Sequence, residues 1–179
     1  MGPMTTWGAF AAAECELAAF VAERLRAAPS YLATVRASGA PRVHPVTPIF
    51  TADGLYLFMD PTSPKGADLS ERGWFAIHNG VPDNAGTGGE ASVSSTGHPV
   101  AAAAVRATAA AAASYSPDER YVLFELRPTE VRDDMRFTVW HVRRRYCTRS
   151  PDDIPDRNVA ERVGFFGESI DQRQALRRC

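Results

Sequence analysis

Three short apolar segments separated by turns, between residues 31 and 65, decide the fold. They read Tyr31-Leu-Ala-Thr-Val-Arg36, Gly39-Ala-Pro-Arg-Val-His-Pro-Val46 and Gly54-Leu-Tyr-Leu-Phe-Met59, and Ser63-Pro-Lys65 follows them. Turn residues at 38–41 and 53–54 separate segments rich in β-branched and aromatic side chains, which is typical of antiparallel strands joined by hairpins. We therefore predict a β-meander with strands over 31–37, 42–50 and 55–59.

The middle strand of this meander carries two prolines, Pro45 and Pro48. Proline cannot donate a hydrogen bond to a neighbouring strand. Because the two prolines are an odd number of residues apart, the missing donors face opposite edges. We expect this strand to be irregular or partly unpaired, as strands beside a ligand often are.

The rest of the chain alternates between strand-like and helix-like patterns. Leu17, Phe20, Val21 and Leu25 recur at helical spacing, and Thr5 or Thr6 is placed to cap an earlier turn. Further helices are predicted over 64–71 and 99–113, a loop over 79–89, and strands over 74–78, 91–96, 120–126, 130–135 and 138–145. Seven or eight short strands with tight early hairpins indicate a mainly β fold with helices (α+β), a closed or split barrel rather than a doubly wound parallel sheet.

Size and charge exclude several classes of protein. The 179 residues suffice for one domain, which we place at residues 1–149, with a polar C-terminal extension at 150–179. A net charge of −1 gives no sign of nucleic-acid binding, and no apolar run is long enough for a membrane span. The cysteines Cys15, Cys147 and Cys179 form neither a metal pattern nor a disulfide framework. With no signal-peptide pattern at the start, a cytoplasmic protein is expected.

The sequence contains no familiar catalytic or metal-binding motif. There is no nucleophile elbow, no phosphate-binding Walker loop and no pair of Cys or His at metal-ligand spacing. The four histidines, at positions 44, 78, 98 and 141, lie in separate predicted elements, which favours structural or surface roles. We therefore predict no metal site, and the catalytic residues stay unassigned.

One group of residues has the chemistry of a phosphate site. Arg42 begins the proline-containing strand, and Ser63 and Lys65 open the predicted helix at 64–71. Lys65 is the only lysine among 20 Lys and Arg residues. A helix N-terminus, a hydroxyl group and two cations can together bind a phosphate dianion. On these residues alone a solvated surface remains the alternative.

The order and spacing of these segments resemble the flavin-binding core of the pyridoxamine 5'-phosphate oxidase-like family over about fifty residues. The resemblance implies a split β-barrel of the FMN-binding type that works as a homodimer with FMN between the subunits. It implies that Arg42 and Lys65 hold the FMN phosphate and that Ser63 donates a hydrogen bond to it. The remaining implied cofactor-binding residues lie along two strands: Val43, His44, Pro45, Val46 and Thr47 beneath the flavin ring, and Phe58 and Met59 beside the ring and ribityl chain.

The resemblance also implies an activity, an FMN-dependent oxidoreductase that transfers a hydride to or from a small substrate. Residues 91–94 would approach the partner's cofactor, and the loop at 79–89 would form a mobile lip. The chain departs from true pyridoxamine phosphate oxidases at Trp140-His-Val-Arg-Arg-Arg145, where they carry Trp and Arg-x-His in another order. Vitamin B6 oxidation is therefore not assigned. Two alternatives stay open: a deazaflavin-dependent reductase of the same fold, and a non-catalytic flavin or haem binder.

Overall fold

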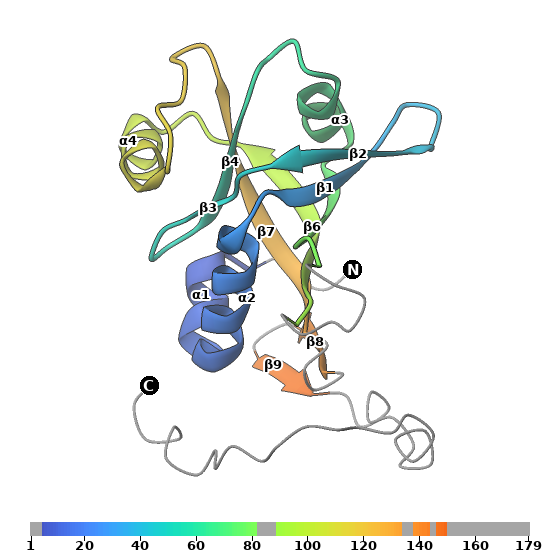
Figure 1. The fold of residues 1–179 in the computed structure, drawn as a ribbon, viewed down its shortest axis with the longest axis vertical. Helices are drawn as coiled ribbons and strands as arrows, with labels where there is room; N and C mark the ends of the chain where they lie inside the picture. The colour runs from blue at the N-terminus through green and yellow to red at the C-terminus, as the bar shows by residue number, and fades with distance from the viewer. Residues whose placement is uncertain (1–4, 82–88, 134–137, 144–145, 150–179) are drawn as a thin grey trace.

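One curled antiparallel sheet forms the centre of the molecule. The structure, a computed structural model, describes residues 5–81, 89–133, 138–143 and 146–149. The sheet order is β2-β1-β5-β6-β7-β4-β3, and β8 pairs with β7 and β9. The strands are β1 (Ser30–Val35), β2 (Pro41–Val46), β3 (Ile49–Phe50), β4 (Leu55–Met59), β5 (Trp74–His78), β6 (Ala91–Pro99), β7 (Val122–Asp133), β8 (Thr138–Arg143) and β9 (Tyr146–Arg149). This is the predicted split β-barrel (Figure 1).

The barrel is split where the predicted middle strand breaks. That segment forms two strands, β2 and β3, separated by Thr47 and Pro48. β2 pairs with β1, and among the described strands no ladder joins it to β3 or β4. The expectation of a partly unpaired strand is thus confirmed. A free strand edge results, along β2, next to the start of α3.

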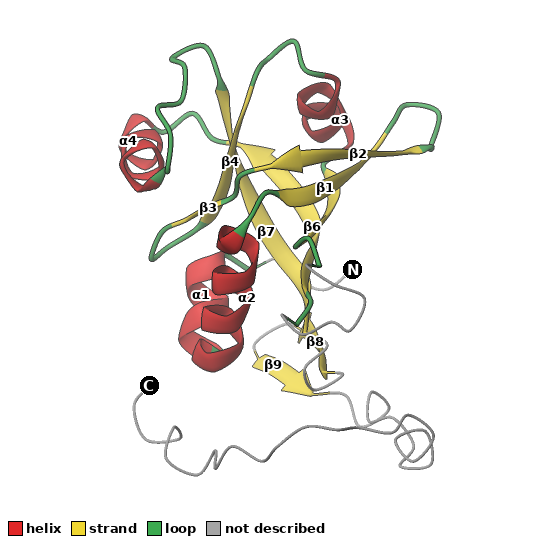
Figure 2. Cartoon of the chain, in the orientation of Figure 1, coloured by secondary structure: helices red, strands yellow, loops and turns green. Residues whose placement is uncertain are grey.

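In the described part of the chain four helices surround the sheet: α1 (Trp7–Ala13), α2 (Cys15–Ala27), α3 (Pro64–Arg72) and α4 (Ala103–Ala112). Figure 2 shows α1 and α2 together on one side, α3 beside β1 and β2, and α4 beside β3 and β4. Thr6 caps α1 as predicted, because its side chain accepts a hydrogen bond from Ala9 N at 3.2 Å. α3 begins with Pro64 and is followed by Gly73 in the left-handed conformation at φ 74°.

Two apolar clusters hold these layers together. The larger fills the curl of the sheet and joins α1, α2 and α3 to it, with Phe10, Leu25, Leu32, Leu69, Ile77 and Phe124 among its most buried members. The smaller lies under α4 and contains Ile49, Tyr56, Phe58, Ala109 and Leu123. Because β4 contributes to both clusters, alternate side chains of this strand point to opposite faces.

Several predicted elements have other boundaries in the structure. The strands predicted at 120–126 and 130–135 are one strand, β7, which passes through Pro128. Ser94 pairs with Glu130 and Ser95 with Pro128, so Thr129 is the extra residue of a bulge, where proline is tolerated. The helix predicted from residue 99 begins only at Ala103, and β6 continues to Pro99.

Cys15 is disulfide-bonded, so the prediction that the cysteines form no disulfide is wrong for this residue. None of the described helices is long and apolar enough to cross a membrane. The described residues hold no group of three metal-binding side chains. The extension at 150–179 and most of the loop at 79–89 lie outside the described residues.

Candidate functional site

Arg42 and His44 lie on the inner side of β2. They alternate with the exposed residues Pro41, Val43 and Pro45, and both are partly buried. In the ladder with β1, Arg42 lies opposite Thr34. Because partners in a ladder share a face of the sheet, Arg42 and His44 point the same way as the buried side of β1, toward α3.

The start of α3 supplies the second half of the site. The Ser63 hydroxyl oxygen accepts a hydrogen bond from Gly66 N at 3.2 Å and caps the helix, while its own proton stays available to a ligand. A Cβ at residue 66 would lie 3.0 Å from Ser63 Oγ and 3.2 Å from the Asp60 carbonyl oxygen. Glycine at this position therefore keeps the cap and the preceding turn closely packed. Lys65, in the first turn, makes no ion pair with any described residue.

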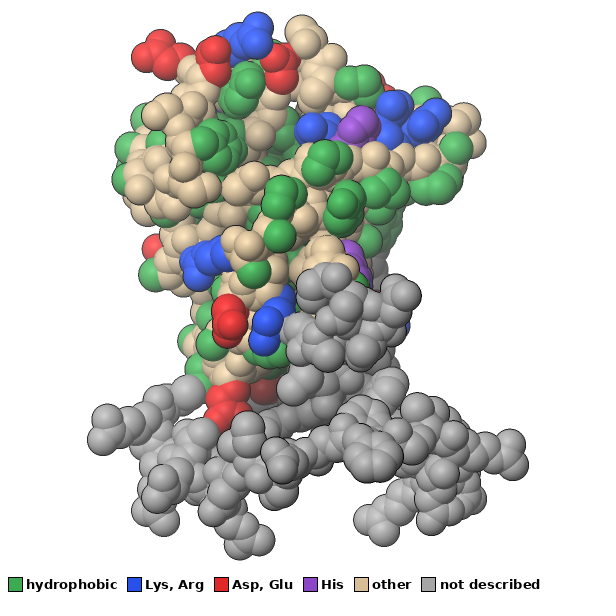
Figure 3. All heavy atoms as spheres, viewed as in Figure 1, with side chains coloured by type: hydrophobic (Ala, Val, Ile, Leu, Met, Phe, Trp, Pro, Cys, Tyr) green, Lys and Arg blue, Asp and Glu red, His purple; other side chains and the backbone are tan. Residues whose placement is uncertain are grey.

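His44 lies near several charged side chains of β2, α3 and the turn after β1. Burial lowers the pKa of the His44 imidazole, and the positive charges of Lys65, Arg42 and Arg36 lower it further, against the opposite effect of Asp68. We call Arg36, Arg42, His44 and Lys65 the basic cluster. Figure 3 shows Lys and Arg side chains on both sides of a histidine where β2 passes α3. The neutral form of His44 is therefore favoured beside these cations.

Polar groups of the basic cluster remain without partners in the described part of the chain. His44 Nε2 is buried and has no hydrogen-bond partner there. Arg42 uses only Nε, which donates to Asp68 Oδ2 at 2.8 Å, so its two terminal amino groups make no hydrogen bond to a described residue. A buried polar atom without a partner is costly unless a ligand satisfies it. These hydrogen-bond donors, the positive charges of Arg42 and Lys65, and the N-terminus of α3 together fit a phosphate group.

Several of the predicted cofactor-binding residues point away from the basic cluster. Val43 and Pro45 point outward, Val46 is buried, and Thr47 is exposed where the barrel splits. Met59 is adjacent to the start of α3, since its Cβ lies 3.7 Å from the position of a Cβ on Gly66.

Phe58 points to the other face of β4. Its ring lies in the cluster under α4, where the Arg106 guanidinium stacks 4.9 Å from its centroid. A direct contact of the Phe58 side chain with a ligand at the basic cluster therefore has no support in this arrangement. The flavin contacts of the other predicted residues remain predictions.

Sequence reasoning missed three residues beneath the basic cluster: Asp68, Thr34 and Arg72. Asp68 accepts hydrogen bonds from Arg42, Thr34 Oγ1 and Arg72. Burial by itself would raise the pKa of this carboxyl, but the hydrogen bonds from Arg42, Thr34 and Arg72 outweigh it and hold the pKa below its ordinary value. A usable signal existed, because Asp68 precedes Leu69 on the buried side of an otherwise polar helix.

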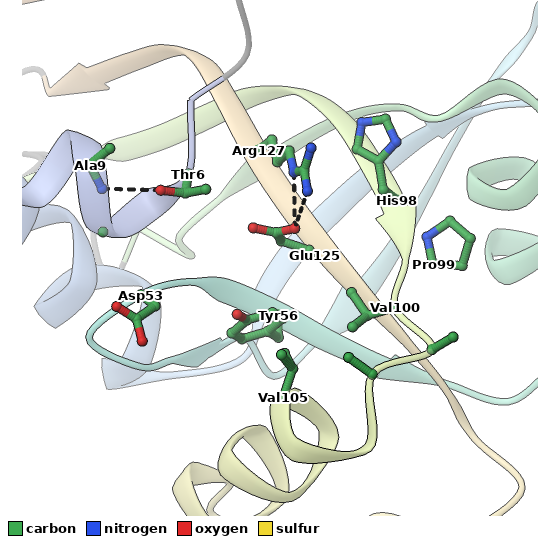
Figure 4. Close-up of a pocket in the computed structure, with 13 residues that line it drawn as sticks. Thr6, Ala9, Asp53, Tyr56, His98, Pro99, Val100, Val105, Glu125 and Arg127 are labelled. Carbon is green, nitrogen blue, oxygen red and sulfur yellow. Dashed lines mark hydrogen bonds and ion pairs between the residues drawn. The ribbon is translucent and has the colours of Figure 1, made fainter.

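A cavity of about 490 Å³ lies away from the basic cluster, between α1, α4 and the sheet (Figure 4). Tyr56, Glu125 and His98 form one row across three neighbouring strands on its floor. Arg127 donates to Glu125 Oε2 from Nε at 2.9 Å and from a terminal nitrogen at 2.8 Å. The pKa of the Tyr56 hydroxyl is raised by burial and by the charge of Glu125, so it stays protonated. No residue of the basic cluster lines this cavity.

Beside the basic cluster, the outer side of β2, β1 and β5 carries a group of exposed apolar side chains. Val43, Ala33 and Ala76 lie opposite one another across the three strands. Tyr31 is 49% exposed, Trp74 47% and Val43 60%. These five residues, Tyr31, Ala33, Val43, Trp74 and Ala76, are called the apolar sheet face. An exposed apolar face of this kind usually marks an interaction surface.

One family model matches the sequence, and many solved structures share the fold. The family described as pyridoxamine 5'-phosphate oxidase matches residues 16–134. No curated protein matches the sequence. A heme binding protein from Mycobacterium smegmatis is 17% identical with a TM-score of 0.53, over 74% of this chain and 57% of that one. This chain therefore spans less than two thirds of that protein.

Two further solved structures have this fold. A conserved hypothetical protein from Mycobacterium tuberculosis is 14% identical with a TM-score of 0.55, over 68% of this chain and 83% of that one. PhzG from Burkholderia lata 383, in complex with tetrahydrophenazine-1-carboxylic acid, is 17% identical with a TM-score of 0.52, over 76% and 87% of the two chains. At such identities the likeness is one of fold.

Proposed function

The chain belongs to the pyridoxamine 5'-phosphate oxidase family, and we propose that it binds FMN and acts as a flavin-dependent oxidoreductase on a small substrate. The observation that carries this proposal is the basic cluster at the start of α3. There Arg42, Lys65 and the unpartnered His44 Nε2 leave donors and positive charge unused among the described residues. A phosphate monoester would satisfy all of them.

Each residue of the site has a distinct part in this proposal. Arg42 offers its two terminal amino groups to phosphate oxygens, and Lys65 adds a compact charge. The Ser63 hydroxyl donates a hydrogen bond to the phosphate while its oxygen caps α3. The free edge of β2, from Val43 to Thr47, offers backbone groups to the polar edge of the flavin. When bound, FMN supplies hydride transfer, and the chain supplies position and surroundings.

The cofactor would lie between two copies of the chain. The apolar sheet face borders the basic cluster, because Val43 and His44 are neighbours on opposite faces of β2. A second copy packed on this face would cover the exposed rings of Tyr31 and Trp74. We therefore include a homodimer in the proposal, with its interface along β2, β1 and β5.

Haem binding is the second candidate function. It is favoured by the neutral His44 imidazole, whose Nε2 has no partner among the described residues, since such a nitrogen is a common iron ligand. The nearby cations would suit the carboxylates of haem. The fold is also that of a heme binding protein from Mycobacterium smegmatis. Arg36 extends the basic cluster toward the β1–β2 turn, so a deazaflavin with a longer anionic tail remains a variant of the main proposal.

The absorption spectrum of the purified protein tests these candidates, because flavin, deazaflavin and haem absorb at different wavelengths. The protein would then be titrated with FMN, riboflavin and haem while flavin fluorescence or haem absorbance is followed. We expect a flavin spectrum, or saturable binding of FMN that is tighter than binding of riboflavin. Binding of haem but neither flavin would replace the proposal by the second candidate.

A further inference from the structure

A buried carboxylate lies directly behind Arg42. Asp68 is 4% exposed, and both of its oxygens accept hydrogen bonds. Oδ2 accepts from Arg42 Nε at 2.8 Å and from Thr34 Oγ1 at 2.9 Å, and Oδ1 accepts from a terminal nitrogen of Arg72 at 3.1 Å. Thr34 is itself only 1% exposed. Asp68 therefore connects α3 to β1 and β2 from inside the protein.

The two arginines use this carboxylate differently. All three nitrogens of Arg72 are occupied, by the Val35 carbonyl oxygen at 2.6 Å, by Glu71 Oε2 at 2.7 Å and by Asp68. Each nitrogen of Arg72 thus already donates a hydrogen bond within the protein. Arg42 contacts Asp68 through Nε alone. Because a guanidinium is planar, a bond at Nε sets the plane and direction of both terminal amino groups.

Judged by its charge alone, Asp68 should weaken the binding of a phosphate. Its negative charge lies near the basic cluster and repels any anion bound there. A site that depended only on total positive charge would bind phosphate more tightly without this carboxylate. Orientation of Arg42 works against that repulsion, because a flexible arginine loses more conformational freedom when it binds a phosphate.

We infer that Asp68 is a positioning residue, which aims Arg42 at the phosphate and so creates the preference of this site for a phosphorylated flavin over riboflavin. This inference rests on the proposed function. Asp68 does not touch the ligand, and its effect reaches the phosphate through Arg42. Thr34 supports the same carboxylate, and Arg72 balances part of its charge.

The test measures dissociation constants of FMN and riboflavin for the full chain and for Asp68→Asn, by quenching of flavin fluorescence. Asparagine keeps the size of the side chain but removes the charge that holds Arg42. We expect FMN binding to weaken about tenfold to hundredfold, the range for loss of a charge-assisted hydrogen bond, and riboflavin binding to change less than about twofold. Equal or tighter FMN binding by this variant would overturn the inference.

A second pair of variants separates positioning from a general effect on folding. If Asp68 acts through Arg42, then Asp68→Asn should change FMN affinity little in an Arg42→Gln background, whereas independent effects would multiply. Thr34→Val, which removes one hydrogen bond from the carboxylate, should reduce the FMN preference in the same direction but less. It also provides the test should Asp68→Asn fail to fold. Unchanged preference in Thr34→Val together with multiplying effects in the double variant would contradict the inference.

The outcomes distinguish this inference from the proposed function. A wild-type chain that prefers FMN, with the same preference in Asp68→Asn, would refute the role of Asp68 and leave the function standing. A wild-type chain that binds neither flavin would refute both.

Discussion

Lys65 is the residue at which the phosphate site is most directly tested. It makes no ion pair with a described residue and lies in the first turn of α3. Lys65→Ala should weaken FMN binding about tenfold to hundredfold, since a charge-assisted hydrogen bond contributes roughly 1.5 to 3 kcal/mol. Riboflavin binding should hardly change, because riboflavin lacks the phosphate. Titration of both flavins measures the difference.

The matched control for Lys65→Ala is Arg24→Ala, which removes a positive charge from α2, where the partly buried Arg24 pairs with Glu23. This control should leave both affinities unchanged. An equal loss for FMN and riboflavin in Lys65→Ala would mean that the phosphate binds elsewhere.

His44 carries a prediction about pH. Burial and the neighbouring cations hold the pKa of its imidazole below the ordinary value in the free protein. A bound phosphate dianion would stabilise the protonated form and raise this pKa. Between the two pKa values FMN binding should take up a proton, so His44 should strengthen FMN binding as pH falls through that window.

An NMR titration of the imidazole proton signals, with and without FMN, measures the pKa of His44 directly. Riboflavin serves as the control, because it carries no phosphate charge. His78 and His98, which are not in the basic cluster, provide internal references. A pKa of His44 that stays the same when FMN binds would show that the imidazole does not face the phosphate.

At the scale of elements, the capped start of α3 can be compared with the capped start of α1. Ser63 accepts from Gly66 N and Thr6 from Ala9 N, both at 3.2 Å. Ser63→Ala and Thr6→Ala should each lower the free energy of unfolding by about 1 kcal/mol. Only Ser63→Ala should also weaken FMN binding, about fivefold, because it alone removes a donor from the phosphate site.

Denaturant unfolding and FMN titration of both cap variants distinguish the two effects. If both variants lost FMN affinity in proportion to their stability, Ser63 would be a structural cap and not a ligand. A Thr6→Ala variant with unchanged affinity keeps the comparison valid.

For the whole molecule, we predict a homodimer formed by the apolar sheet face. Trp74, 47% exposed on β5, lies on this face. Trp74→Arg should convert the dimer to a monomer, because a charge buried in an apolar interface loses its solvation. Light scattering at micromolar concentration, with FMN in excess, measures the mass.

Tyr115 provides the control for the dimer, since it is 37% exposed but lies outside the sheet, in the segment between α4 and β7. Tyr115→Arg should leave the mass unchanged. A monomeric wild-type protein would rule out the homodimer, and a dimeric Trp74→Arg would place the interface on another surface.

The elements that were predicted well are those with signals in their own sequence. β4 and β5 have the predicted boundaries because turn residues enclose each apolar run. α4 begins four residues later than predicted, since an alanine-rich run offers no cap and packing of Ala109 on the cluster under this helix decides its position. The sequence predicts two strands in place of β7, on either side of Pro128, because only pairing with β6 reveals the bulge there.

By itself, the sequence determined the turns, the periods of the strands and helices, and the positions of Arg42, Ser63 and Lys65 at the ends of their elements. These features depend on residues a few positions apart. Only the tertiary structure decided that Asp68 holds Arg42 and Thr34, which are 26 and 34 residues away in sequence, and that His44 is partly buried among cations. The physical reason is that burial and pairing arise where distant elements meet, and a local pattern carries no information about that contact.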